Sequence, residues 1–137
     1  MGGHGLGFSG RSSSQSTDHT ALCARAIILA WHVWQTQSCD IATVMFGMHE
    51  MPAQARRRVI RNALRLARDK VLVVDIWPGF EPSPMMLSGE PFVLDYLANI
   101  EEDVRESHDP MVWEVMRVDV VEQHVRMWKF ERLEWGI

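Results

Sequence analysis

Two apolar runs separated by a helical pattern constrain this fold more than any other feature of the sequence. The first run covers residues 41–46, is partly β-branched, and lies between Asp40 and Gly47. The second covers residues 71–76. Continuous apolar runs of this length are typical of strands buried on both faces of a parallel sheet. The order strand, helix, strand therefore predicts a β-α-β unit whose sheet is covered on both faces.

The residues between the two runs have the spacing of an amphipathic helix that begins after Pro52 and extends to about residue 68. One predicted face is apolar and consists of Ile60, Ala63, Leu64 and Ala67. Arginines cover much of the remaining surface: Arg56, Arg57, Arg58, Arg61, Arg65 and Arg68. Such a group could contact phosphate, but the formal net charge is −4 and no aromatic residues are interleaved. We interpret it as a solvent-exposed helix face and expect no nucleic-acid partner.

The rest of the chain predicts a loop, a second helix and a hairpin. Turn-forming prolines and glycines mark residues 77–91 as a loop. A second helix should bury a stripe made of Val93, Leu97, Ile100 and Val104. Two strands at about 112–121 and 124–133 follow with a tight turn between them, so they must be antiparallel neighbours. Their aromatic residues, Trp113, Trp128 and Phe130, are predicted to lie in the core. The predicted fold class is α/β, with a terminal antiparallel β-hairpin.

The first 37 residues differ in composition from the remainder. Residues 1–20 are rich in glycine and serine, and residues 21–34 are apolar without a clear period. We expect 1–37 to be disordered or poorly defined and 38–137 to form the domain. No apolar run in the 137 residues is long enough for a membrane span, and two cysteines are too few for a disulfide scaffold. A cytoplasmic location is expected, with an organellar transit peptide as the open alternative.

Ligands of open α/β sheets bind at the carboxyl ends of the strands, which places the candidate site after Phe46 and after Asp75. There Gly47 would allow close backbone approach. His49 could be a general base or an orienting donor, or a loop histidine that satisfies a backbone carbonyl. Glu50 could bind substrate or only stabilise the following helix. A zinc motif beginning at His49 would need a second histidine where Ala53 stands, so no metal is expected.

Residues 40–52, the arginine-rich helix and residues 70–75 together resemble the fourth strand, helix and fifth strand of class I S-adenosylmethionine-dependent methyltransferases. The resemblance is strongest to the small-molecule branch that includes ubiquinone and menaquinone biosynthesis enzymes. It extends over about 38–133, because the family closes its sheet with an antiparallel strand. It implies a partial Rossmann-like methyltransferase sheet and methyl transfer from S-adenosylmethionine to a small-molecule acceptor.

The resemblance also assigns roles to residues. Phe46, Gly47 and Met48 match the segment beside the cofactor, and His49 is the candidate catalytic residue. Substrate contacts are expected from Glu50, Met51 and Trp77, and from Met85 and Met86, whose flexible side chains suit an adaptable apolar contact.

The family's first three strands and its glycine-rich cofactor loop have no counterpart in the sequence. We therefore expect the C-terminal half of a methyltransferase, truncated and with weak or no cofactor binding by itself. The alternative is a non-catalytic interaction protein that pairs through its exposed sheet edge, as a homodimer.

Overall fold

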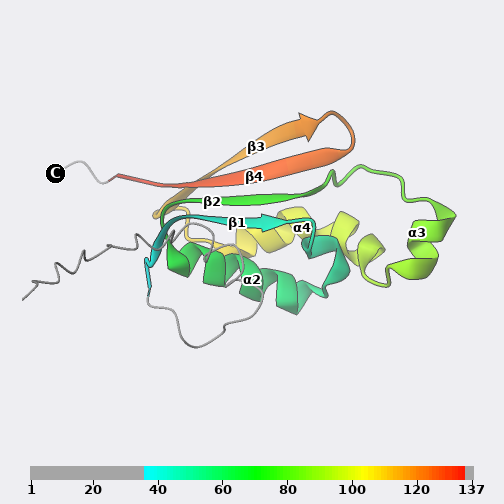
Figure 1. Cartoon of the computed structure of the whole chain (residues 1–137), viewed down its shortest axis with the longest axis horizontal. Coiled ribbons are helices and arrows are strands. Elements are labelled where there is room, and N and C mark those ends of the chain that lie inside the picture. Colours follow the sequence, from blue (N-terminus) through cyan, green and yellow to red (C-terminus); the bar gives the residue numbers. More distant parts are fainter. Residues whose placement is uncertain (1–35, 135–137) are drawn as a thin grey trace, which may run out of the picture.

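The computed structural model describes residues 36–134, and the expectations for residues 1–35 lie outside that range. Within residues 36–134 the chain forms one four-stranded sheet and three α-helices (Figure 1). In chain order these are β1 (Cys39–Met45), the 3-10 turn η1 (Met48–Glu50), α2 (Ala53–Leu66), β2 (Ala67–Ile76), α3 (Pro84–Gly89), α4 (Val93–Ser107), β3 (Trp113–Val121) and β4 (Val125–Arg132). The α/β class is confirmed. None of the helices in this part of the chain is long and apolar enough to cross a membrane.

The sheet has the order β1-β2-β4-β3. Strands β1 and β2 are parallel, and β4 is antiparallel to both of its neighbours. Val73 shows the register, since it lies opposite Val44 of β1 and Trp128 of β4. The predicted β-α-β unit and terminal hairpin are thus both confirmed. The hairpin turns at Gln123, which has a φ of 60°.

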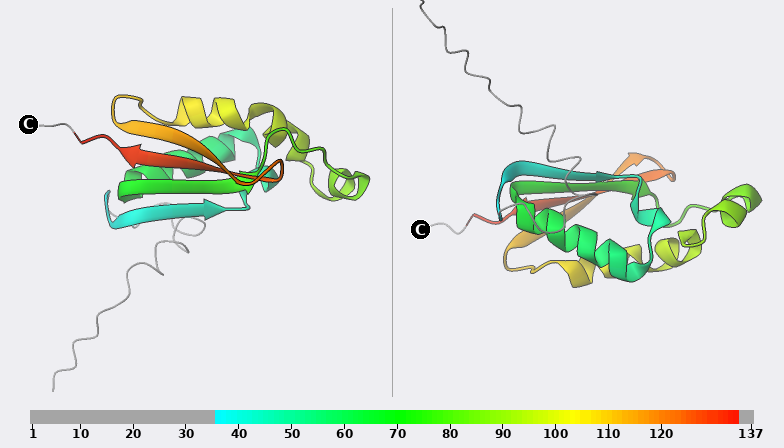
Figure 2. Two further views of the ribbon diagram at one scale, coloured as in Figure 1. Left: turned by 90° about the horizontal axis from the view of Figure 1, so that it is seen from above. Right: turned by 60° about the horizontal axis from the view of Figure 1, so that its bottom comes forward.

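Both long helices lie on the same side of the sheet (Figures 1 and 2). Alternate residues that face them, such as Ala42, Val71 and Val73, are almost fully buried. Residues that point the other way range from half-buried, as for Leu72 and Val74 of β2, to exposed, as for Met45 at 60% and Val118 at 42%. Among the described residues, the prediction of burial on both faces was therefore wrong for β1 and holds only in part for β2. An apolar run indicates that its side chains prefer burial, but other segments of the fold must supply the residues that cover its second face.

Two predicted boundaries also needed correction. Helix α2 ends at Leu66 because Ala67 already has extended backbone angles and begins β2 directly. Ala67 is fully buried, as its apolar position in the helical pattern required, but it is buried in the strand. The predicted loop at 77–91 contains the short helix α3, which starts with Pro84 after the N-cap Ser83.

The core lies between the sheet and the two helices. Its predicted aromatic members are confirmed: Trp128 and Phe130 are fully buried and Trp113 is 5% exposed. The apolar stripe of α4 is buried too, except Leu97, which packs only partly against the core.

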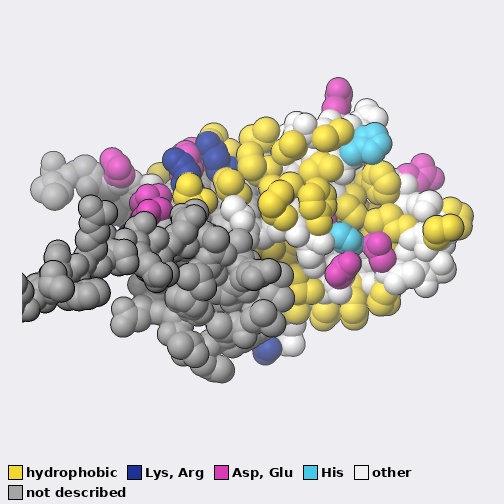
Figure 3. Space-filling view, in the orientation of Figure 1, with side chains coloured by type: hydrophobic (Ala, Val, Ile, Leu, Met, Phe, Trp, Pro, Cys, Tyr) yellow, Lys and Arg dark blue, Asp and Glu magenta, His cyan; other side chains and the backbone are white. Residues whose placement is uncertain are grey.

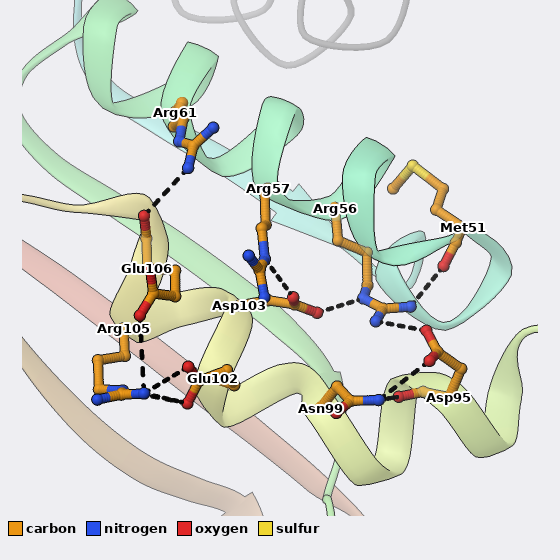
Figure 4. Close-up of polar contacts among 10 residues, drawn as sticks. All are labelled: Met51, Arg56, Arg57, Arg61, Asp95, Asn99, Glu102, Asp103, Arg105 and Glu106. Carbon is orange, nitrogen blue, oxygen red and sulfur yellow. Dashed lines mark hydrogen bonds and ion pairs between the residues drawn. The ribbon is translucent and has the colours of Figure 1, made fainter.

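The arginine-rich face of α2 is not uniformly exposed. Arg56 is fully buried, and its guanidinium lies between α2 and α4 (Figure 4). Its Nε donates to Oδ2 of Asp103 at 2.6 Å, and Nη2 donates to Asp95 at 2.7 Å. Arg57 binds the other oxygen of Asp103 at 2.7 Å. The solvent-exposed interpretation was wrong for Arg56, because α4 packs its acidic side against this part of α2.

Candidate functional site

The ends of β1 and β2 lie side by side and are joined through one buried carboxylate. Asp75 is fully buried near the end of β2. One of its oxygens accepts the backbone N–H of Met48 at 2.7 Å and that of His49 at 3.4 Å. The other accepts the N–H of Ile76 at 2.8 Å. The chain that leaves β1 is thus folded around Asp75, which confirms the predicted proximity of the two strand ends.

The turn out of β1 depends on an unusual backbone conformation at Phe46. This residue has a φ of 52°, in the left-handed region that bulky side chains rarely adopt. Backbone strain of this kind costs about 1–3 kcal/mol and clusters at functional sites. The following Gly47 has an ordinary φ of −122°. A Cβ built on Gly47 would meet only the carbonyl oxygen of Met45, at 4.0 Å, so the space beside it is open.

His49 is held by Asp75. Its Nδ1 lies 2.6 Å from Oδ1 of that carboxylate, and the residue is only 8% exposed. A carboxylate can only accept, so Nδ1 carries a proton, and the neutral form of the ring has its lone pair at Nε2. The hydrogen-bond partner of Nδ1 is thus a carboxylate, and not a backbone carbonyl as in the alternative interpretation of His49. A histidine oriented in this way is suited to accept a proton at Nε2.

Two further residues face the imidazole, and sequence reasoning missed both. Oε2 of Glu90 lies 3.6 Å from Nε2. The ring of Tyr96 meets the imidazole edge-on, with centroids 6.2 Å apart. Its hydroxyl donates to the carbonyl of Ile76 at 2.5 Å. Burial, and then the negative charge of Asp75, raises the pKa of Tyr96 far above its ordinary value, so it remains a neutral phenol.

The buried arginine connects this site to the helices. Nη1 of Arg56 donates to the carbonyl of Met51 at 2.7 Å (Figure 4). Met51 is half-buried and directly follows η1, so the Arg56 network fixes the end of the segment that carries His49. Glu50 of the same segment is exposed.

The remaining predicted site residues differ in how far their side chains are buried. Met48 has a fully buried side chain, so it offers a ligand little beyond its backbone. Trp77 is half-buried, and its backbone N–H donates to the backbone carbonyl of His124 at 2.9 Å. Met85 is 83% exposed on α3, a helix with no buried residue that projects from one end of the molecule (Figures 1 and 2). Met86, on the same helix, is half-buried.

The surface around the site carries both polar and hydrophobic side chains. Near the carboxyl end of β1, a histidine side chain reaches the surface between acidic side chains, with hydrophobic side chains around them (Figure 3). Phe46, 49% exposed, and Met45 contribute to the apolar surface at this end of β1. Three surface pockets of the described residues lie elsewhere, between α4 and β3, beside the start of β2, and near His108.

Comparison with known proteins gives one structural likeness of interest. No protein-family model matches the sequence, and no curated protein matches it. Among solved structures, the chain is similar to a SAM-dependent methyltransferase from Aquifex aeolicus, with a TM-score of 0.46 and 12% identity. The match covers 74% of this chain and 50% of that one, so the chain spans about half the length of that structure. At this identity and TM-score the likeness assigns neither a family nor an activity to the chain.

Proposed function

We propose that the described residues form the acceptor side of a methyltransferase site that transfers a methyl group from S-adenosylmethionine to a small molecule. The observation that carries this proposal is the imidazole of His49, which Asp75 orients at the carboxyl ends of two adjacent parallel strands. This is the position at which open α/β sheets bind their ligands.

The residues around the β1 turn fit one side of the cofactor. The space beside Gly47 would be narrowed by any Cβ, and Phe46 offers a half-exposed ring next to it. S-adenosylmethionine supplies an electrophilic methyl group on a sulfonium sulfur. The protein's own part would be to hold the acceptor beside the strand ends and to take its proton at Nε2 of His49. The orientation of that lone pair depends on Asp75.

An NMR titration of the chain with S-adenosylmethionine tests the proposal, because it detects binding in the millimolar range. We expect shifts of the backbone amides of residues 46–51 and 75–77. Gly47→Ala should weaken this binding at least about fivefold, since fivefold corresponds to about 1 kcal/mol of lost contact. Gly89→Ala is the matched control, because a Cβ there would meet nothing within 4 Å and would lie on α3, away from the turn after β1.

Shifts spread evenly over the chain, or an equal effect of both alanine substitutions, would contradict the proposal. Micromolar affinity would contradict a narrower expectation, that binding is weak in the absence of the family's glycine-rich loop. His49→Ala should leave the amide shifts in place, since the imidazole acts on the acceptor and not on the cofactor.

A second candidate function is self-association through the edge of β1, and a specific observation favours it. Among residues 36–134, strand β1 has a sheet neighbour on one side only, and two of its outward residues, Ile41 and Met45, are 43% and 60% exposed. Unpaired strand edges with apolar neighbours are templates for pairing with another chain. Sedimentation should then show a dimer that Ile41→Lys converts to monomer, whereas Glu102→Lys on α4 leaves it intact. A monomer at all concentrations removes this candidate.

A further inference from the structure

A buried carboxylate oxygen of Glu90 lies close to the imidazole of His49, beside η1. In the neutral form of this imidazole, the hydrogen bond from Nδ1–H to Asp75 leaves the lone pair on Nε2, which is then an acceptor. Oε2 of Glu90 is buried and has no hydrogen-bond partner among the described residues. The two atoms are 3.6 Å apart, beyond hydrogen-bond distance, and the side chain of His49 is only 10% exposed.

We propose that this pair binds a primary amine, and that the amine is the nitrogen acceptor of the methyl group. The second half of this statement rests on the proposed function, whereas the binding site does not. A buried acceptor without a donor costs about 1–3 kcal/mol. One nitrogen with at least two N–H bonds satisfies both atoms together, whereas a hydroxyl group carries a single hydrogen and leaves one of them unpaired.

The charges around the pair favour a cation as well. Asp75 of β2 and Glu90 after α3 are both acidic and face the imidazole from opposite sides. Tyr96 of α4 is a neutral phenol whose proton is committed to a carbonyl. Arg56, which contacts the carbonyl of Met51 in this segment, is already paired with two aspartates of α4. An ammonium group would therefore enter surroundings of net negative charge.

Access to the pair depends on a part of the fold that is weakly attached. Glu90 directly follows α3, a helix with no buried residue, and its own side chain is 31% exposed. Entry of an amine between Oε2 and Nε2 would therefore displace a segment whose helix contributes no buried residue. The described residues contain no group of three histidine, cysteine or acidic side chains arranged to hold a metal ion, so a metal is not the expected occupant.

In the transfer itself the bound ammonium group first gives one proton to Nε2 of His49, which leaves a neutral amine with a lone pair. This lone pair forms the new N–C bond as the C–S bond of the methyl donor breaks and leaves its electron pair on sulfur. The nitrogen keeps its two N–H bonds as a secondary ammonium ion, and the imidazolium of His49 lies between the carboxylates of Asp75 and Glu90.

Three small probes separate hydrogen bonding from charge and from apolar contact. Benzylamine carries the proposed group, benzyl alcohol replaces it with a hydroxyl, and benzyltrimethylammonium keeps the charge without any N–H. Each is titrated into the labelled full chain without S-adenosylmethionine, while NMR follows the imidazole nitrogens of His49. We expect benzylamine to shift these signals and the other two to bind at least about tenfold more weakly, because a site with unpaired polar groups rejects analogues that lack the donor.

A pair of variants tests the role of Glu90. Glu90→Gln removes its charge with little change of shape and should weaken benzylamine binding about tenfold, as expected for a charge-assisted hydrogen bond. Glu81→Gln, an exposed position in the same connection, should leave binding unchanged. Thermal melts of both variants establish that the fold is intact.

Equal binding of the amine and the alcohol, or of the amine and the trimethylammonium ion, would overturn the proposal. So would a Glu90→Gln variant that binds benzylamine normally. Imidazole signals showing a proton on Nε2 above the usual histidine pKa of about 6.5, together with no response to benzylamine, would overturn it too, since Glu90 would then be satisfied by His49 itself. Amine binding without any response to S-adenosylmethionine would support this site and contradict the proposed methyl transfer.

Discussion

Replacement of Arg56 by methionine should strongly destabilise the domain. The substitution keeps much of the side-chain volume but removes bonds to Asp103, Asp95 and the carbonyl of Met51, all 2.6–2.7 Å long. Asp103 is fully buried and would retain only Arg57. Breaking a buried ion pair by removing one partner costs about 3–5 kcal/mol. This is a large part of the roughly 5–15 kcal/mol that stabilises a typical domain.

Urea unfolding followed by circular dichroism measures this cost. With a slope of about 1–3 kcal/mol per molar urea, the midpoint should fall by at least about 1 M. Arg105→Met is the matched control, because the Arg105 side chain is 67% exposed and binds Glu102 on the surface of α4. Its midpoint should remain close to that of the parent chain, since exposed ion pairs contribute little.

A second substitution tests whether the buried charge of Asp103 causes the loss of stability in Arg56→Met. In Arg56→Met, a further Asp103→Leu substitution should restore part of the stability, because it removes the buried charge that lost its main partner. Equal midpoints for Arg56→Met and Arg105→Met would refute the argument. So would a double variant less stable than Arg56→Met alone. At the candidate site, Arg56→Met should change the NMR chemical shifts of the backbone amides of residues 48–51, because the carbonyl of Met51 loses its hydrogen bond from Arg56.

Three further outcomes are expected. Burial raises the pKa of Tyr96, so the contribution of this residue to the free energy of unfolding should be constant below about pH 10 and fall above it by up to about 1.4 kcal/mol per pH unit; Tyr96→Phe should remove this part of the pH dependence in urea titrations. Asp75→Asn should move the imidazole proton of His49 from Nδ1 to Nε2, which nitrogen NMR detects; an unchanged tautomer would contradict the role of the carboxylate. Gly79→Ala should displace the ring of Trp77, because a Cβ there overlaps it, and alter its fluorescence; identical spectra would show that the ring already lies elsewhere.

Several parts of this structure follow directly from local sequence patterns. The β-branched runs, the helical spacing of the arginine-rich segment and the short link before residue 125 correctly predicted β1, α2, β2 and the hairpin of β3 and β4. The convergence of Asp75 with the segment after β1 was also predictable, because adjacent parallel strands end at the same edge of a sheet. Each of these features is local or follows from a general rule of sheet topology.

Other features were decided only when the elements packed. Periodicity gave Arg56 a solvent-exposed position, but two acidic side chains of α4 meet it there and allow its complete burial. Glu90 and Tyr96 reach His49 from segments that no spacing connects to it. The partial exposure of the second face of the sheet, as seen in the described residues, has the same origin. A sequence pattern indicates how strongly each side chain prefers burial. The partner that the side chain contacts depends on how helices and strands that are distant in the sequence pack in the folded structure.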